Sequence, residues 1–202
     1  SDVCSSDLDR IIDAAASGQV DFGENKAGEL AEKAVALPAG CGPVRWHMIG
    51  HLQRNKAGVV AEHADVFHAL DSLRLARRLD SRCSEVGRIL PCYVQVNVSG
   101  ESSKFGLDPG DLYPFLDQMG EFEHLQIEGL MTLAAPVEDP EDVRPQFRLL
   151  RSLAIGYGHD RVQNVALEAL SMGMSGDFEI AIEEGATHVR IGSAIFGARS
   201  YT

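Results

Sequence analysis

The chain has 202 residues, of which 45% are hydrophobic, and its 18 basic and 30 acidic side chains give a formal net charge of −12. This length and apolar content suit a single globular domain with a sizeable core. The acidic balance argues against a nucleic-acid partner. Because no apolar run approaches the roughly 18 residues of a membrane helix, we expect no membrane association either.

The cysteines and the first residues indicate the compartment. Cys4, Cys41, Cys83 and Cys92 form neither a CxxC pair nor a zinc-type spacing, so we expect free thiols in a reducing environment. No basic segment followed by a hydrophobic one opens the chain, which gives no indication of a secretory signal. These observations favour the cytoplasm.

Apolar patterns with helix and strand periods alternate along the chain. Residues 1–8 are rich in Ser and Asp and show no period, so we expect a tail there, with a single domain over residues 9–202. Short apolar runs between turn residues predict strands at residues 20–24, 44–52, 66–70, 91–98, 125–133, 165–172 and 187–191. Amphipathic periods and helix caps predict helices at residues 8–16, 26–36, 55–62, 73–87, 109–119, 140–155 and 177–184, and from residue 193.

This strict alternation predicts a parallel sheet covered by helices. Two α/β architectures fit the pattern, an open doubly wound sheet and a TIM-type (β/α)8 barrel. No GxGxxG motif follows the first strand, which weakens the dinucleotide-binding version of the open sheet. A barrel needs eight strands and about 250 residues. One helix in front of seven strands therefore favours a barrel whose first strand is missing or replaced.

Two strand ends near the C-terminus have the composition of an anion-binding site. The stretches ALSMGMSGD at residues 169–177 and VRIGSAIFG at residues 189–197 both pass from a strand through Gly and Ser into a helix. Small residues let backbone N–H groups approach an anion, and a helix start adds a favourable dipole. Barrel enzymes often bind phosphate with the loops after strands 7 and 8. The pattern predicts a phosphate site, although an ordinary capped turn would also explain the first stretch.

Six blocks in collinear order carry a resemblance to a known family. The blocks are FGEN at residues 22–25, WHMIGHLQRNK at 46–56, NVSGESSKFG at 97–106, GLMT at 129–132, LSMGMS at 170–175 and RIGSAIFG at 190–197. Together they resemble the YggS/PROSC family of pyridoxal phosphate homeostasis proteins. The resemblance implies a barrel similar to the alanine racemase N-terminal domain, with pyridoxal 5′-phosphate (PLP) bound at the mouth formed by the carboxyl ends of the strands.

The resemblance also implies a function. Members of this family are cytoplasmic, have no established catalytic activity and are thought to buffer and deliver PLP, which makes PLP-dependent apoenzymes the implied partners and a monomer the implied intact form. Two alternatives stay open. One is a fold-type III racemase-like PLP enzyme, and the other is a PLP-independent phosphosugar enzyme with Glu24 or His47 as its base. The candidates for the second acid–base group of a racemase are Tyr93, Tyr113, Tyr157 and Tyr201.

The family motifs assign eight residues to the cofactor. They are Asn25, His47, Ser171, Met172, Gly173, Arg190, Gly192 and Ser193. The resemblance implies that Ser171, the backbone near Gly173, Gly192 and Ser193 hold the phosphate, while Arg190 faces the pyridine nitrogen. An arginine at that position keeps the nitrogen unprotonated, which suits a carrier or a racemase-like centre.

The remaining three residues have smaller expected roles. Asn25 is expected to line the pocket, His47 to form a hydrogen bond at the mouth, and Met172 to pack near the ring or in the core. His47 and His51 lie four residues apart, but no third ligand accompanies them, so we expect no metal site.

One family feature has no counterpart in the sequence. Family members carry their Schiff-base lysine on the first strand, in a segment resembling Val-Ser-Lys. The four lysines here, Lys26, Lys33, Lys56 and Lys104, all follow the first predicted helix. We therefore expect an N-terminally truncated chain without a catalytic lysine. Lys26 and Lys33 are expected on an outer helix, and Lys56 and Lys104 near the mouth, where a nucleophilic lysine would need partial desolvation.

Overall fold

The computed structural model describes residues 3–101, 104–135, 137, 139–158 and 161–197. The strands are β1 (Asp21–Glu24), β2 (Arg45–Met48), β3 (Val66–Leu70), β4 (Leu90–Gln95), β5 (Leu125–Met131), β6 (Val165–Met174) and β7 (His188–Arg190). The α-helices are α1 (Val3–Ala16), α2 (Ala27–Ala36), α3 (Ala57–His63), α4 (Leu73–Glu85), α5 (Leu112–Asp117), α6 (Arg144–Tyr157), α7 (Phe178–Glu183) and α8 (Ser193–Phe196). Short 3-10 helices are η1 (Arg54–Lys56), η2 (Pro109–Asp111), η3 (Met119–Glu121) and η4 (Pro140–Val143).

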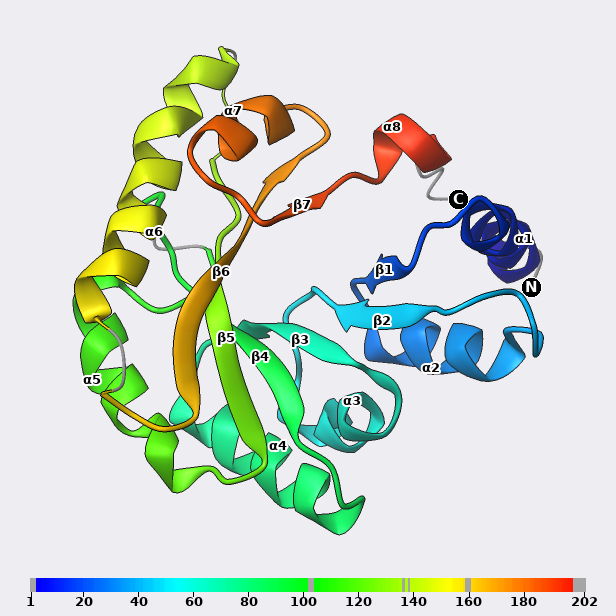
Figure 1. Ribbon diagram of the computed structural model, residues 1–202, viewed down its shortest axis with the longest axis horizontal. Coiled ribbons are helices and arrows are strands. Elements are labelled where there is room, and N and C mark those ends of the chain that lie inside the picture. The colour runs from blue at the N-terminus through cyan, green and yellow to red at the C-terminus, as the bar shows by residue number, and fades with distance from the viewer. Residues whose placement is uncertain (1–2, 102–103, 136, 138, 159–160, 198–202) are drawn as a thin grey trace.

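The seven strands form one parallel sheet in the order β1-β2-β3-β4-β5-β6-β7. Each strand lies beside its neighbour in sequence, so the sheet advances in one direction and curls into a nearly closed barrel (Figure 1). A doubly wound sheet would reverse its strand order at a switch point, and this sheet does not. The predicted barrel is therefore confirmed. Arg10 Nη1 donates to the carbonyl oxygen of Phe196 at 2.7 Å, which joins α1 to α8 between the two ends of the sheet.

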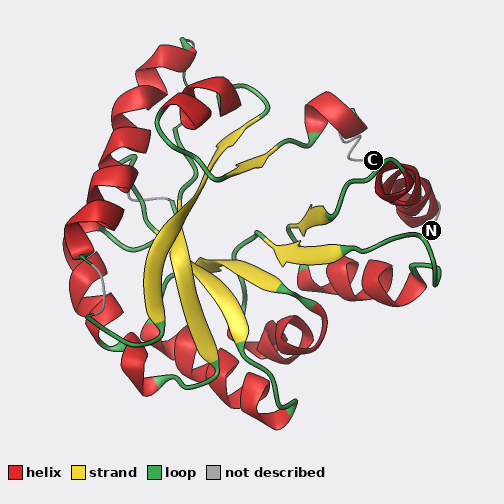
Figure 2. Cartoon of the chain, in the orientation of Figure 1, coloured by secondary structure: helices red, strands yellow, loops and turns green. Residues whose placement is uncertain are grey.

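The apolar core lies between the sheet and the helices, which cover its outer side (Figure 2). On α4, Leu75, Ala76, Leu79 and Cys83 are buried at helical spacing and form one face of the helix. Burying a side chain the size of leucine stabilises the fold by about 1.5–3 kcal/mol. None of the described helices is long and apolar enough to cross a membrane.

Several predicted element bounds differ from the structure, including those of the first helix, the second strand and the helix over residues 109–119. The first helix begins at Val3 rather than residue 8, because periodicity reveals only the part of a helix that carries an apolar stripe. Strand β2 ends at Met48, and Gly50 then lies against the backbone of Asn25, which a Cβ at Gly50 would approach to 2.1 Å. The predicted helix over residues 109–119 is divided into η2, α5 and η3, with Pro109 opening a 3-10 turn.

Two of the cysteines are buried thiols that stay protonated. Cys41, Cys83 and Cys92 are free thiols. Burial raises the pKa of Cys83 to about 11 and the pKa of Cys92 well above its ordinary value, so both stay protonated. The side chain of Cys4 lies outside the described part of the chain.

The close approach of β5 and β6 at Gly129 gives a test of the barrel. A Cβ at Gly129 would lie 1.9 Å from the carbonyl oxygen of Ala169 on β6. Since the paired strands cannot separate without losing ladder hydrogen bonds, we expect Gly129→Ala to lower the free energy of unfolding by about 1–3 kcal/mol in urea denaturation. Gly28→Ala is the matched control: a Cβ at this α2 position meets no atom within 4 Å, and alanine should stabilise the helix by about 0.5–1 kcal/mol. Equal stability of Gly129→Ala and the unchanged protein would contradict this pairing of β5 with β6.

Candidate ligand site

Polar side chains from five strands form a continuous chain of hydrogen bonds inside the barrel. Asp21 Oδ1 lies 2.9 Å from His47 Nε2, and His47 Nδ1 lies 2.8 Å from His68 Nε2. His68 Nδ1 lies 3.0 Å from Ser171 Oγ, and Arg190 Nη1 donates to the same hydroxyl oxygen at 2.7 Å. The residues belong to β1, β2, β3, β6 and β7, so the chain links the first strand of the sheet to the last.

Strand alternation explains why these side chains face the interior. Successive residues of a strand point to opposite faces of the sheet. Glu24 forms a buried ion pair with Lys33 of α2, so its side chain lies on the helix side, and Asp21, an odd number of residues earlier, faces inward. On β2, Trp46 belongs to the apolar core and its neighbour His47 faces inward by the same rule.

Asp21 is the anionic end of the hydrogen-bond chain. Arg45 Nε donates to Asp21 Oδ1 at 2.6 Å, and His47 Nε2 lies within hydrogen-bond distance of the same oxygen. Burial alone would raise the pKa of Asp21, but its hydrogen bonds with Arg45 and His47 hold this pKa below its ordinary value. The carboxylate is therefore charged near neutral pH and can only accept hydrogen bonds.

The charges at the two ends fix the direction of each hydrogen bond between them. His47 donates to the carboxylate from Nε2, so its neutral ring accepts at Nδ1 from His68 Nε2. His68 then accepts at Nδ1 from the hydroxyl of Ser171, whose oxygen accepts from Arg190. One proton lies in each link, and every group of the chain is satisfied.

The aromatic rings in and around the hydrogen-bond chain are neutral. Burial lowers the pKa of His47 and His188 and lowers that of His68 well below its ordinary value. Tyr93 stacks on His68 with ring centroids 4.4 Å apart, and its hydroxyl lies 3.3 Å from His188 Nδ1. Burial raises the pKa of Tyr93 to about 12, so the phenol stays protonated. These rings therefore leave the charge of Arg190 unbalanced.

Arg190 is the cationic end, and within the described residues it has no ion-pair partner. Its Nη1 donates to Ser171 and its Nη2 donates to the carbonyl oxygen of Thr132 at 2.7 Å, so both acceptors are neutral. Burial lowers the pKa of Arg190 to about 10, which reflects the cost of desolvating the charge. Arg190 remains charged near neutral pH and is partly exposed, so an anion that reaches it would offset that cost.

Five of the predicted residues lie near or just after the carboxyl ends of β6 and β7. Ser171 and Arg190 are in direct contact. Gly173 follows on β6 with a φ of 92°, a conformation that favours glycine. Gly192 is the N-cap of α8 and Ser193 its first residue, and both lie at the surface two and three positions after the end of β7.

The other three predicted residues have different surroundings. His47, one residue before the carboxyl end of β2, forms hydrogen bonds with His68 and Asp21. Met172 is fully buried in the apolar core, and since it alternates with Ser171, only its backbone can face the site. Asn25 is exposed after β1, and no hydrogen bond of its side chain occurs among the described residues.

The lysines lie as the sequence predicts. Lys33 is on α2 and Lys26 is the N-cap of that helix, which places both on the outer layer. Lys56 is exposed at the end of η1, and Lys104 Nζ donates at 3.3 Å to a backbone carbonyl that follows β5. Because Glu24 is paired with Lys33 on the helix side, it cannot serve as the base of a phosphosugar enzyme at the mouth.

Sequence reasoning missed several residues of the interior. Asp21, His68, Thr132 and His188 belong to the hydrogen-bond chain or contact its members. Strand parity could have found some of them, because His68 alternates with the fully buried core residues Phe67 and Ala69. Their contacts, however, join strands far apart in sequence and required the closed sheet.

Comparison with known proteins places the chain in a family. A model of the alanine racemase N-terminal domain matches residues 2–200. The chain is 42% identical over 183 residues to the pyridoxal phosphate homeostasis protein of Aquifex aeolicus, across 89% of this chain and 77% of that protein. The chain belongs to the family of pyridoxal phosphate homeostasis proteins. It is also 41% identical over 194 residues to the Escherichia coli K12 member, which covers 95% of this chain and 81% of the relative.

Solved structures agree with this assignment. PipY of Synechococcus elongatus PCC7942 without PLP superposes with a TM-score of 0.87 at 37% identity, covering 94% of this chain and 87% of PipY. PipY with PLP bound gives a TM-score of 0.85. Alanine racemase of Clostridium difficile 630 is only 12% identical, with a TM-score of 0.72 over 95% of this chain and 48% of the racemase, so it supports the fold alone.

The buried histidines give a prediction for stability as a function of pH. Their folded-state pKa values lie below the ordinary value of about 6.5, so unfolding takes up protons as the pH falls below about 6.5. The stabilisation is fully present above that pH and is lost as the pH falls toward the folded-state pKa values. We expect each histidine to contribute a slope of up to about 1.4 kcal/mol per pH unit below about pH 6.5.

The pH dependence of the free energy of unfolding, measured by urea denaturation, distinguishes the contribution of His68 from that of other acid-sensitive groups. His68→Gln keeps hydrogen-bonding atoms but removes the titrating ring, so the dependence on pH should become shallower. His63→Gln, at the end of α3 and outside the cluster, is the matched control, and it should flatten the slope less than His68→Gln does. A His68→Gln variant with the original slope would show that His68 is not held neutral by the barrel.

Proposed function

We propose that this chain binds PLP at the carboxyl ends of β6 and β7 and acts in PLP homeostasis, holding and delivering the cofactor without turning over a substrate. The observation that carries the proposal is Arg190, a largely desolvated cation whose partners are neutral oxygens. The names of the curated relatives, and the PipY structure with PLP bound, support the same ligand.

The residues present fit an anionic cofactor. Arg190 supplies the positive charge and an N–H donor for the pyridine nitrogen, while the exposed backbone at Gly192 and Ser193 would hold the phosphate. Ser171 is fully buried beneath Arg190, so we assign it the role of orienting the guanidinium group. Ser171 would contact the phosphate directly only if the side chain of Arg190 moved. When bound, PLP supplies an electron-accepting ring, and an arginine beside its nitrogen would weaken that capacity.

The tyrosines favour a carrier over a racemase-like enzyme. Tyr93 is inside the barrel, but its pKa of about 12 suits a hydrogen-bond donor better than a base. Tyr113 donates to the carbonyl of Leu153 and Tyr157 donates to Asp117, contacts that hold both rings in the helical layer. Tyr201 lies outside the described residues. The apoenzyme partners, the monomeric state and the cytoplasmic location stay predictions.

Removing the cation tests the proposed site. We expect Arg190→Gln to weaken PLP binding by about 10-fold or more in isothermal titration calorimetry, because charge-assisted hydrogen bonds are lost. Ser171→Ala combined with Ser193→Ala should cost about 1–3 kcal/mol of binding free energy. The matched controls Arg151→Gln on α6 and Ser84→Ala on α4 change exposed residues of the outer helices rather than residues at the carboxyl ends of β6 and β7, and these variants should bind PLP normally.

Two outcomes would contradict the proposal. Unchanged PLP affinity in Arg190→Gln would show that PLP does not bind at Arg190. Equal affinity for pyridoxal and PLP would show that the protein does not recognise the phosphate group. Borohydride treatment followed by mass spectrometry should detect no adduct, and a stable mass increase on Lys56 or Lys104 would contradict noncovalent binding.

A further inference from the structure

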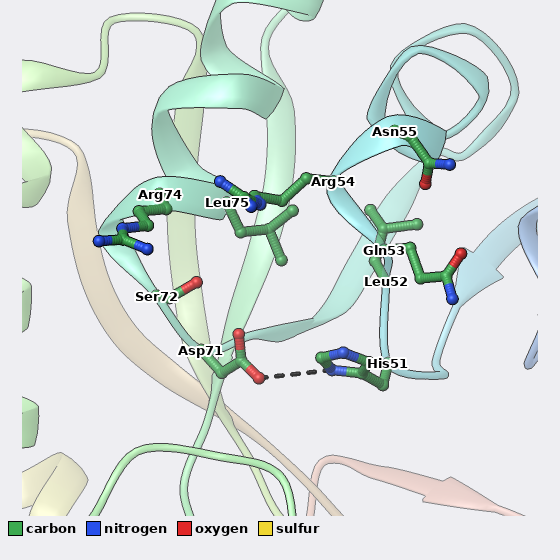
Figure 3. A pocket seen from close by; sticks show the side chains of 9 residues that line it. All are labelled: His51, Leu52, Gln53, Arg54, Asn55, Asp71, Ser72, Arg74 and Leu75. Carbon is green, nitrogen blue, oxygen red and sulfur yellow. Dashed lines mark ion pairs between the residues drawn. The ribbon is translucent and has the colours of Figure 1, made fainter.

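A basic groove lies at the rim of the barrel, beyond the carboxyl ends of β2 and β3 rather than those of β6 and β7. Two adjoining hollows of about 590 and 610 Å³ open between η1 and α4, and both are lined by Arg54, Asn55 and Arg74. Arg77 and Arg78 line the second hollow. We call this feature the α4 groove and define it by these five residues. Figure 3 shows the first hollow, with Arg54 and Arg74 extending from η1 and α4 on either side of Leu75.

The arginines of the α4 groove are unusual in lacking partners. Most arginines that the structure describes form a hydrogen bond or an ion pair. In the same described ranges, the exceptions are Arg54, Arg74, Arg77, Arg78 and Arg151. Four of these five line one groove. In a chain with 30 acidic side chains, this concentration of unneutralised charge stands apart from its surroundings.

Acidic side chains are almost absent from the groove. Asp71 is the one carboxylate that lines the first hollow, and its Oδ2 is held by His51 Nδ1 at 3.5 Å (Figure 3). The residues lining the second hollow include no acid. The first turn of α4 also has no acidic residue, and Ser72 makes no side-chain cap. The helix dipole and the arginine charges therefore act in the same direction.

We propose that the α4 groove binds an oligophosphate, a small ligand with at least two linked phosphate groups. Arg74 and the pair Arg77–Arg78 are about one helical turn apart, roughly 5 Å along the axis. A chain of linked phosphates can span the two hollows, whereas a single phosphate can occupy only one. Guanidinium groups bind phosphate oxygens in pairs, and each hollow has the volume of a small-ligand site. The site is separate from the proposed PLP site and does not depend on it.

Binding of inorganic triphosphate to the whole chain tests this proposal by isothermal titration calorimetry at low ionic strength. We expect triphosphate to bind more tightly than inorganic phosphate and to weaken as salt is added. Arg54→Gln combined with Arg74→Gln should weaken the binding about 10-fold or more, because it removes charge from both hollows. Both side chains are exposed, so circular dichroism should report an unchanged fold.

A single variant controls for charge. Arg151→Gln removes the one other unpartnered arginine among the described residues, which lies on α6, and should leave triphosphate affinity within about twofold. A loss of binding in this control would overturn the groove assignment. Equal affinity for phosphate and triphosphate, or tighter binding of a poly-glutamate peptide, would overturn the oligophosphate assignment.

Discussion

The arrangement of polar groups inside this barrel depends on the hydrogen bonds of Arg190. A guanidinium that is mostly removed from water needs compensation, and here it comes from the hydroxyl of Ser171 and the carbonyl of Thr132, both neutral. Its charge orients the Ser171 hydroxyl toward His68, and the order continues through His47 to Asp21. The interior is thus a directed chain with its uncompensated positive end at the carboxyl ends of the strands. We propose that an anionic ligand completes this arrangement.

The two faces of the sheet divide stability from binding. Apolar residues such as Phe67 and Leu75 lie between sheet and helices and stabilise the barrel without contributing donors to the interior. The interior face carries histidines, a tyrosine and the charged ends of the chain, and burial keeps the rings neutral. A neutral ring donates one hydrogen bond and accepts another, so it aligns the hydrogen bonds of neighbouring strands without adding charge. The barrel therefore supplies orientation, and Arg190 supplies attraction.

The sequence predicted the fold better than the interior of the barrel. Each strand and helix has its own period, so the alternation and most element bounds could be found locally, and the small residues around Ser171 and Gly192 marked strand ends. The outer positions of Lys26 and Lys33 followed from helix periodicity too. His68 and Thr132 could not be assigned, because their roles depend on partners on strands far away in sequence. The α4 groove was missed for the same reason, since Arg54 and Arg74 meet only in the folded chain.

Nitrogen-15 NMR of the histidine rings tests the directed chain and its link to the ligand most directly. We predict that His47 and His68 are neutral near pH 7, as their depressed pKa values require, and that both carry the proton on Nε2. Addition of PLP should shift the Nδ1 resonance of His68, whose partner Ser171 contacts Arg190, and leave His124 unchanged. A charged His68 ring, a proton on its Nδ1, or a His68 resonance that does not respond to PLP would contradict the directed chain and its coupling to the ligand.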